Sequence, residues 1–252
     1  MNLLSPLALV GFVLDGSIAN VTLERSQVGN ALSASMVDGM NLALDRAAEA
    51  GARMIVLRGA GKHMCTGFDL SDLENCSDGD LLLRFVRVEQ LLQKLYRSPV
   101  TSVAVGSGRT YGAGADLFAS CDRRIGLPNT KFAFPGSGFG LVLGSRRLAA
   151  RIGNDAARRV LLKGDELGVE EAARLGLVTD ICDEAALPDL LAEIAATASR
   201  LAPETVRALH DVTISRDDDA DLAALVKSAS LPGLKDRIVT YRGKVTAARK
   251  AG

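Results

Sequence analysis

The chain has 252 residues and contains no tryptophan, only two histidines and only four cysteines. The cysteines are scattered along the chain as Cys65, Cys76, Cys121 and Cys182. None of them has the CxxC spacing that is typical of zinc sites, and so few thiols do not make a disulfide scaffold. We therefore expect neither a metal site nor structural disulfides.

The chain also lacks an excess of charge of either sign, because 30 Lys and Arg residues balance 30 Asp and Glu residues. Proteins that bind nucleic acid need a basic surface, so we expect no nucleic-acid partner. Long hydrophobic runs are missing as well. The apolar stretch at residues 7–14 is too short to span a membrane, and no Lys or Arg precedes it as in a signal peptide. We expect a cytoplasmic protein without membrane contact.

The apolar residues that are present, 48% of the chain, follow a pattern of alternating strands and helices. Residues 8–14 and 18–24 are strand-like and are joined by Asp15-Gly16, which predicts a hairpin. Ser33 is a plausible N-cap for a helix, and the apolar run at residues 54–57 predicts a following strand. Strand, helix and strand in this order indicate a parallel sheet, so the predicted fold class is α/β.

The rest of the chain continues this alternation and then becomes helical. The expected helices are 81–95, 146–152, 156–162, 170–175, 187–201, 204–214, 222–230 and a last segment to residue 249, and the expected strands are 100–105, 124–127, 130–134 and 178–182. We also expect Asp69 to begin a helical segment and residues 135–138 to form a flexible loop. We place a boundary near Pro188. Residues 1–187 then form the core, and residues 188–252 form a C-terminal helical region.

Two glycine-rich turns follow strands of the predicted sheet. In the first, at residues 103–122, Gly112 and Gly114 flank Ala113 where a helix begins. A helix start leaves backbone N–H groups unpaired and carries partial positive charge, so it attracts negative charge. The second turn, at residues 59–70, contains Phe68. Loops at the carboxyl ends of parallel strands lie on one side of the sheet, so both turns can face one crevice.

Taken together, several stretches resemble the crotonase superfamily, which is also called the enoyl-CoA hydratase/isomerase family. They fit the order of the family's motifs at residues 30–33, 59–70, 105–122 and 132–135, at Arg147-Leu148 and at residues 164–178. The resemblance implies a spiral of strand, strand and helix with helices at the C-terminal end. It also implies a coenzyme A thioester as ligand, no permanently bound cofactor, and a homotrimer or a hexamer of two trimers.

The resemblance further implies roles for single residues. The backbone N–H groups of Phe68 and Ala113 correspond to the oxyanion hole that binds the thioester oxygen, and Asp116 corresponds to a catalytic carboxylate. An Asp that only favours its helix start is the alternative for Asp116. The implied substrate-binding residues are Val28, Thr66, Asp69, Leu70, Gly112, Pro135 and Gly136.

Two departures from the family pattern bear on the reaction. Gly136 stands where hydratases of this family carry a second glutamate, and Leu143-Gly144-Ser145 replaces a longer glycine-rich stretch. Hydration normally needs two carboxylates, whereas moving a proton between two carbons needs one. We therefore expect isomerisation rather than hydration. Thioester hydrolysis, decarboxylation and acyl-CoA binding without catalysis remain alternatives.

Some other polar residues are weaker candidates. Arg109 and Tyr111 can be read as contacts to a polar acyl group, or as a surface ion pair and a packing residue. We expect His63 and Cys65 to take no part in the chemistry. Tyr241, Arg242 and Lys244 lie where the family's last helix often reaches the CoA site of a neighbouring subunit. A helix that packs only on its own subunit is the alternative.

Overall fold

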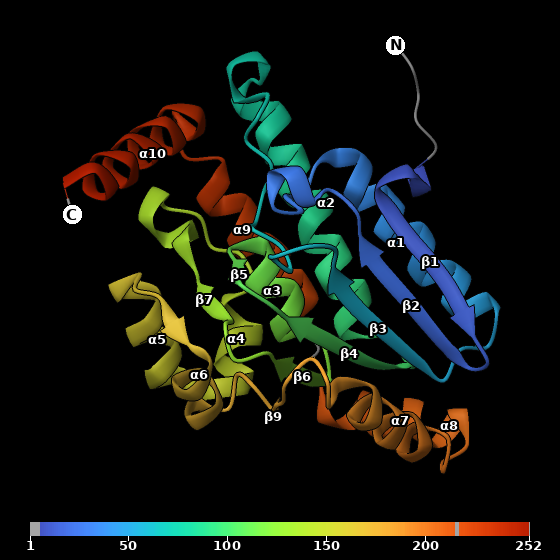
Figure 1. Cartoon of the computed structure of the whole chain (residues 1–252). Coiled ribbons are helices and arrows are strands. Elements are labelled where there is room, and N and C mark those ends of the chain that lie inside the picture. The colour runs from blue at the N-terminus through green and yellow to red at the C-terminus, as the bar shows by residue number, and fades with distance from the viewer. Residues whose placement is uncertain (1–5, 215–216, 252) are drawn as a thin grey trace.

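The computed structural model describes residues 6–214 and 217–251 and has two sheets surrounded by helices (Figure 1). The larger sheet has the strand order β1-β2-β3-β4-β6-β9, and the smaller one the order β5-β7-β8. The strands are β1 Val10–Asp15, β2 Ile18–Leu23, β3 Met54–Gly59, β4 Thr101–Gly106, β5 Arg109–Tyr111, β6 Arg123–Gly126, β7 Lys131–Ala133, β8 Leu167–Gly168 and β9 Asp180–Ile181. The helices are α1 Ala34–Glu49, α2 Asp78–Tyr96, α3 Ala113–Ser120, α4 Ser145–Ile152, α5 Asn154–Lys163, α6 Val169–Leu175, α7 Leu187–Ala198, α8 Pro203–Thr213, α9 Asp218–Ala229 and α10 Leu234–Ala251.

The larger sheet begins with the predicted hairpin and continues as a parallel sheet. β1 pairs with β2 in antiparallel register from Val10↔Leu23 to Asp15↔Ile18, whereas β2, β3, β4, β6 and β9 run parallel. Ser33 accepts a hydrogen bond from the amide of Met36 and thereby caps α1, as its position in the sequence predicts. The predicted α/β fold class is confirmed. The hairpin and the helix cap follow from the local sequence, as predicted.

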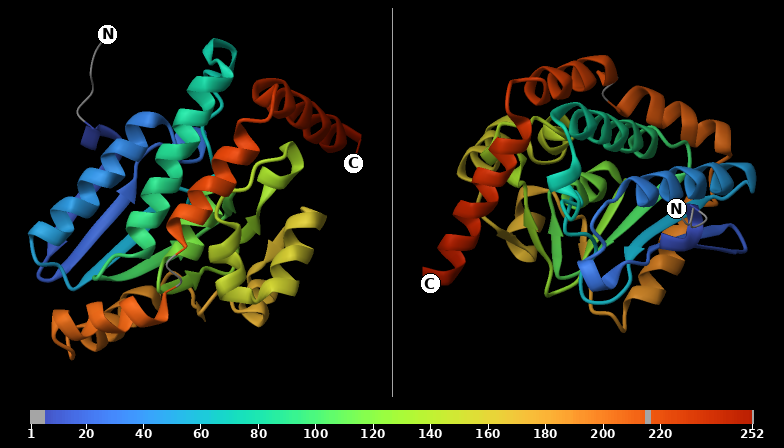
Figure 2. Two further views of the ribbon diagram at one scale, coloured as in Figure 1. Left: turned by 180° about the vertical axis from the view of Figure 1, so that it is seen from behind. Right: turned by 90° about the horizontal axis from the view of Figure 1, so that it is seen from above.

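Both faces of this sheet are covered, which is why β3 and β4 are apolar along almost their whole length. Ile55 and Leu57 point to the face that α1 and α2 cover. Met54 and Val56 point to the other face, where they pack against α7. In the view from behind, α1 and α2 lie in front of the sheet and α7 lies below it (Figure 2). Pro188 falls inside α7, and the boundary we place there remains a prediction.

Of the smaller sheet, the sequence patterns predict only β7, which lies within the expected strand at residues 130–134. β5 has only three residues and follows a glycine-containing turn, so no alternation marks it. It pairs in parallel with β7, and β7 pairs in antiparallel with β8. This sheet fixes the start of α3, because the amide of Gly112 donates to the carbonyl of Ala133 at 2.8 Å.

Two local expectations are wrong. The segment from Asp69, expected to open a helix, forms turns and a short 3₁₀ helix, Leu73–Asn75, because the Asp69 side chain is committed to Arg25 and to the amide of Ser71. The loop expected at residues 135–138 is a 3₁₀ helix, Pro135–Phe139, with proline in its first turn. Within residues 6–214 and 217–251, no helix combines the length and apolarity needed to cross a membrane.

The last two helices pack on α2 and on the 3₁₀ helix Pro135–Phe139. Asp78, at the start of α2, accepts hydrogen bonds from the amides of Leu234 and Lys235 and so caps α10 from outside. Arg237 donates to the carbonyls of Phe139 and Ser228. These contacts place α10 beside the ends of the parallel strands, on its own chain.

Candidate active site

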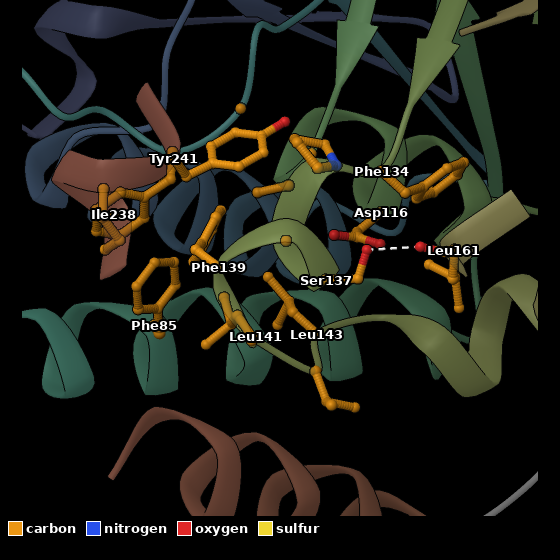
Figure 3. Close-up of a pocket in the computed structure, with 18 of the residues that line it drawn as sticks. Phe85, Asp116, Phe134, Ser137, Phe139, Leu141, Leu143, Leu161, Ile238 and Tyr241 are labelled. Atoms are coloured by element: carbon orange, nitrogen blue, oxygen red, sulfur yellow. Dashed lines mark hydrogen bonds between the residues drawn. The ribbon is translucent and has the colours of Figure 1, made fainter. Parts of the chain in front are cut away.

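A cavity of about 380 Å³ opens between the two glycine-rich turns, the 3₁₀ helix Pro135–Phe139 and α10 (Figure 3). Its wall is mostly apolar and is formed by Thr66, Gly67, Phe68, Leu70, Phe85, Gly112, Ala113, Asp116, Phe134, Pro135, Gly136, Ser137, Phe139, Gly140, Leu141, Val142, Leu143, Ser145, Leu161, Ile238, Tyr241 and Arg242. Asp116 and Leu161 lie toward one end, whereas Ile238 and Tyr241 lie toward the other. Such an apolar cleft with few polar groups is typical of a small-molecule site.

The two predicted oxyanion donors lie in this cavity. Residues 65–68 run beside residues 110–113, since Cys65 bridges to Thr110 and the amide of Tyr111 donates to the Cys65 carbonyl. A Cβ on Gly67 would stand 3.7 Å from the amide nitrogen of Ala113. The amide of Ala113 opens α3 and has no partner within that helix.

The backbone N–H of Phe68 is directed away from Leu32, the residue that runs beside it. Phe68 forms a parallel bridge with Leu32, in which the hydrogen bonds are made by the carbonyl of Gly67 and the amide of Asp69. Successive residues of an extended chain point their amides to opposite sides, so the Phe68 N–H faces the other way. The Phe68 ring stacks on Phe85 and lies under the guanidinium of Arg84, which fixes this segment.

Polar side chains anchor the loop that carries Phe68. Asn30 is fully buried, adopts a left-handed conformation with φ of 56°, and donates from its amide group to the carbonyls of Ala60 and His63. Arg25 binds the carboxylate of Asp69 at 2.8 Å. The ionic partner and the amide of Ser71 outweigh burial and keep the pKa of Asp69 below its usual value. The backbone donors are therefore rigidly positioned.

Asp116 is the deepest ionisable group of the cavity. It lies on the first turn of α3 and is only 5% exposed. Its Oδ1 atom is buried and has no hydrogen-bond partner among the described residues. That oxygen is pressed against Gly144, where a Cβ would stand 2.1 Å from it. Burial raises the pKa of Asp116 well above its usual value.

Of the described residues that line the cavity, Asp116 alone carries a carboxyl group. Gly136 lies on the wall, so the position of the family's second glutamate offers space but no acid. Ser137 donates its hydroxyl to the carbonyl of Leu161 at 2.6 Å. The chemistry available here is one proton acceptor or donor beside two backbone amides.

The structure brings most of the implied substrate-binding residues to this cavity. Thr66, Leu70, Gly112, Pro135 and Gly136 line it together with Phe68, Ala113 and Asp116. Two others do not. Val28 is exposed in a 3₁₀ turn, and the Asp69 side chain is held by Arg25. No contact with a substrate tests these roles, which remain predictions.

Of the weaker candidates, Tyr241 and Arg242 line the cavity, whereas four others lie outside its wall: His63, Cys65, Arg109 and Tyr111. Tyr111 hydrogen-bonds the carboxylate of Glu166, which also pairs with Lys131 at 3.2 Å. His63 accepts a hydrogen bond at Nδ1 from the amide of Arg109. Burial raises the pKa of the Cys65 thiol to about 12. The contacts of these side chains indicate a structural role, and none of the side chains faces Asp116 across the cavity.

Two functional features were missed by the sequence analysis. Arg147 and Glu89 form a buried ion pair near Asp116, although neither lines the cavity. Glu89 directly follows Val88 on the apolar side of α2, but a single acid beside an apolar stripe is usually on the surface, so it gave no usable signal. Ile238 also lines the cavity, which periodicity alone does not reveal.

Comparison with known proteins agrees with this geometry. The model of the family described as enoyl-CoA hydratase/isomerase matches residues 14–229. The chain belongs to the enoyl-CoA hydratase/isomerase family. It is 32% identical over 215 residues to the "Probable enoyl-CoA hydratase echA6" of Mycobacterium tuberculosis, and the match covers 84% of each chain. A crystal structure of an enoyl-CoA hydratase/isomerase family protein from Bordetella parapertussis superimposes with a TM-score of 0.90 at 41% identity, covering 92% of this chain and 98% of that one.

Membership confirms the resemblance, the fold class and the assignment to acyl-CoA enzymes. A protein of Clostridium acetobutylicum named short-chain-enoyl-CoA hydratase is 28% identical over 219 residues. The family name leaves the reaction of the present chain open between hydration and isomerisation, and among the described residues its cavity wall carries one carboxyl group.

Proposed function

We propose that this member of the enoyl-CoA hydratase/isomerase family moves a carbon–carbon double bond within an acyl-CoA thioester. The observation that supports the proposal is the buried Asp116 as the single carboxyl group among the described residues of the cavity wall. Isomerisation removes a proton from one carbon and returns it to another on the same face, which a single group can do. Adding water requires a second group that holds and deprotonates it.

The proposed oxyanion hole consists of the N–H groups of Phe68 and Ala113. When a proton leaves the carbon next to the thioester, negative charge moves to the thioester oxygen. Two amides directed at that oxygen stabilise the enolate, and losing one such donor costs roughly 3 to 4 kcal/mol in activation free energy. The positive end of α3 adds to this effect, because Ala113 is its first residue.

In this scheme Asp116 is the base and then the acid. A carboxylate with an ordinary pKa is too weak a base to abstract a proton from carbon near neutral pH. Burial raises the pKa of Asp116 and so brings it closer to the working pH, which makes the carboxylate a better base. The same carboxyl then delivers the proton to the far carbon of the dienolate.

The cavity also indicates the nature of the acyl group. Around Asp116 the wall is formed by Phe134, Leu143 and Leu161, and none of the described residues places a basic side chain on that end. Arg242 is the single cation of the described wall, and its guanidinium lies 3.5 Å from the carbonyl of Leu70. An uncharged, apolar acyl chain fits this wall. A second carboxylate on the substrate, as decarboxylation requires, would have no counter-ion beside Asp116.

The test is product analysis with a panel of 2-enoyl, 3-enoyl, 3-hydroxyacyl and saturated acyl-CoA esters. We expect interconversion of 2-enoyl and 3-enoyl esters without net formation of 3-hydroxyacyl-CoA. The variant Asp116→Asn should lose turnover by several orders of magnitude and still bind CoA esters. Unchanged turnover in this variant would contradict the assignment of Asp116. Release of free CoA or carbon dioxide would favour hydrolysis or decarboxylation, and no turnover of any ester would favour a binding protein.

A further inference from the structure

Next to Asp116, but outside the cavity, three charged side chains meet between helices. Glu89 comes from α2, Arg147 from α4 and Asp221 from α9. Glu89 and Arg147 are almost completely buried, with 1% and 3% of their surface exposed. The substrate cavity does not contact them, so the family reaction alone does not explain why charges are buried here.

The two terminal nitrogens of Arg147 are engaged by acids from two other helices. Its Nη2 donates to Glu89, and its Nη1 lies 3.4 Å from Asp221. Glu89 is held in turn by the side-chain amide of Gln93 at 3.0 Å. The buried Nε of Arg147 has no acceptor among the described residues. A guanidinium with one unpaired donor among the described residues is therefore kept in place by Glu89 of α2 and Asp221 of α9.

Asp116, in turn, has an unpaired acceptor among the described residues. Its buried Oδ1 has no donor in residues 6–214 and 217–251, and it packs against Gly144, which lies three residues before Arg147 at the start of α4. A carboxylate near an arginine normally forms a bidentate ion pair. Here the available arginine is already bound to Glu89 and Asp221, and no ion pair of Asp116 is found within the described part of the chain.

We propose that Glu89 is a positioning residue for the proton transfer: by engaging Arg147, it withholds that guanidinium from Asp116. The inference rests on the proposed function, since it explains how Asp116 keeps the proton affinity that abstraction from carbon requires. An Asp116 paired with Arg147 would be a stable anion and a poor base. Removing the negative charge of Glu89 should therefore weaken Asp116 as a base without touching the substrate.

The surrounding charges agree with this role. Burial has the largest effect on the pKa of Asp116 and raises it; Arg147 lowers that pKa, and Glu89 raises it. Asp221 is shared with Arg146 on the exposed side. Across the cavity, Arg242 is directed to the carbonyl of Leu70. Arg147 is thus the cation that bears on Asp116, and Glu89 is the group that competes for it.

The test is the variant Glu89→Gln, which removes the charge and keeps the size. In substrate-free protein with ¹³C-labelled aspartate carboxyl groups, NMR follows the titration of Asp116, whose signal is assigned by its loss in Asp116→Asn. We expect the midpoint to fall by about one pH unit, as expected for a neighbouring charge. The acid limb of kcat/KM should fall by the same amount, and Glu89→Asp should restore both.

A remote ion pair provides the control. Asp180→Asn breaks a pair with Arg123 between β6 and β9 and should leave the Asp116 midpoint unchanged. If Glu89→Gln does not fold, Asp221→Asn releases the other side of Arg147 and should lower the midpoint by a smaller amount. An unchanged midpoint in the folded variants would overturn the proposal. A lowered midpoint in an enzyme that turns over no ester would support the link between Glu89 and Asp116 and contradict the isomerase proposal.

Discussion

The carboxyl group of Asp116 occupies the space in which a side chain at position 144 would have to begin. A Cβ on Gly144 would stand 2.1 Å from Oδ1 and 2.5 Å from Cγ of Asp116. Real Cβ atoms do not approach other atoms so closely, so the glycine is a requirement of the site. It also adopts a left-handed conformation, with φ of 65°.

The first prediction follows from this contact. We expect Gly144→Ala to push the Asp116 carboxyl out of place and to lower kcat at least tenfold. The matched control is Gly164→Ala, because Gly164 has φ of 70° and nothing within 4 Å of its Cβ position. Both variants should lose about 1 kcal/mol of stability from backbone strain. Steady-state kinetics should separate them, and equal activities would contradict a role for the Gly144 contact.

A second prediction concerns stability and pH. The folded protein holds the Asp116 proton more tightly than the unfolded chain, whose value is near 3.8. The contribution of this proton to the stability of the folded state is complete below the unfolded pKa, and it is lost as the pH rises through the folded pKa. Asp116→Asn should therefore be more stable than the wild type at pH 8, and the difference should shrink as the pH falls toward 4. Urea unfolding at a series of pH values measures this.

Asp78 offers a control of the opposite sign. Hydrogen bonds from the amides at the start of α10 lower the pKa of its exposed carboxyl group. Its stabilisation is present above the unfolded value and is lost as the pH falls through the lower folded pKa. Asp78→Asn should therefore reduce stability at neutral pH. A loss of stability in Asp116→Asn at pH 8 would show that the Asp116 carboxyl is not held at a raised pKa.

The third prediction is a gain of hydration. A Cβ on Gly136 would meet the carbonyl of Leu141 at 3.4 Å and nothing closer, and the backbone there is not left-handed. Gly136→Glu can therefore place a second carboxyl group in the cavity, where it can deprotonate water. We expect 3-hydroxyacyl-CoA to appear from 2-enoyl-CoA. The variant Gly136→Gln matches it in size, lacks the acid and should form none.

The sequence predicts the strands and turns that surround this site better than the side-chain contacts packed behind it. The first hairpin, the parallel strands after it and the adjacency of the two glycine turns follow from patterns that each depend on a few neighbouring residues. In the proposed oxyanion hole Phe68 and Ala113 act through their backbone, so motifs alone are enough to propose their positions. The ion pair of Glu89 with Arg147 joins residues 58 positions apart, and local periodicity cannot pair two charges across helices.

The short strand β5 and the 3₁₀ helix Pro135–Phe139 are further examples. Each is held by tertiary hydrogen bonds, such as the bond from the amide of Lys131 to the carbonyl of Gly108 and that from Arg237 to the carbonyl of Phe139. A glycine-rich sequence shows only that such turns are permitted. What they enclose depends on segments brought in from elsewhere, including α10.

The last prediction concerns α10 and assembly. We propose a homotrimer or a hexamer of two trimers, as the family resemblance implies, and light scattering at micromolar concentration measures the state. The cavity wall includes Tyr241 and Arg242 of the same chain, whereas Lys244 is exposed and lies outside it. Arg242→Gln should weaken binding of CoA esters about tenfold through loss of one charge-assisted contact. Lys244→Gln should leave the affinity unchanged if each subunit completes its own site. A comparable loss in the Lys244 variant of a trimer would show instead that the last helix serves a neighbouring subunit.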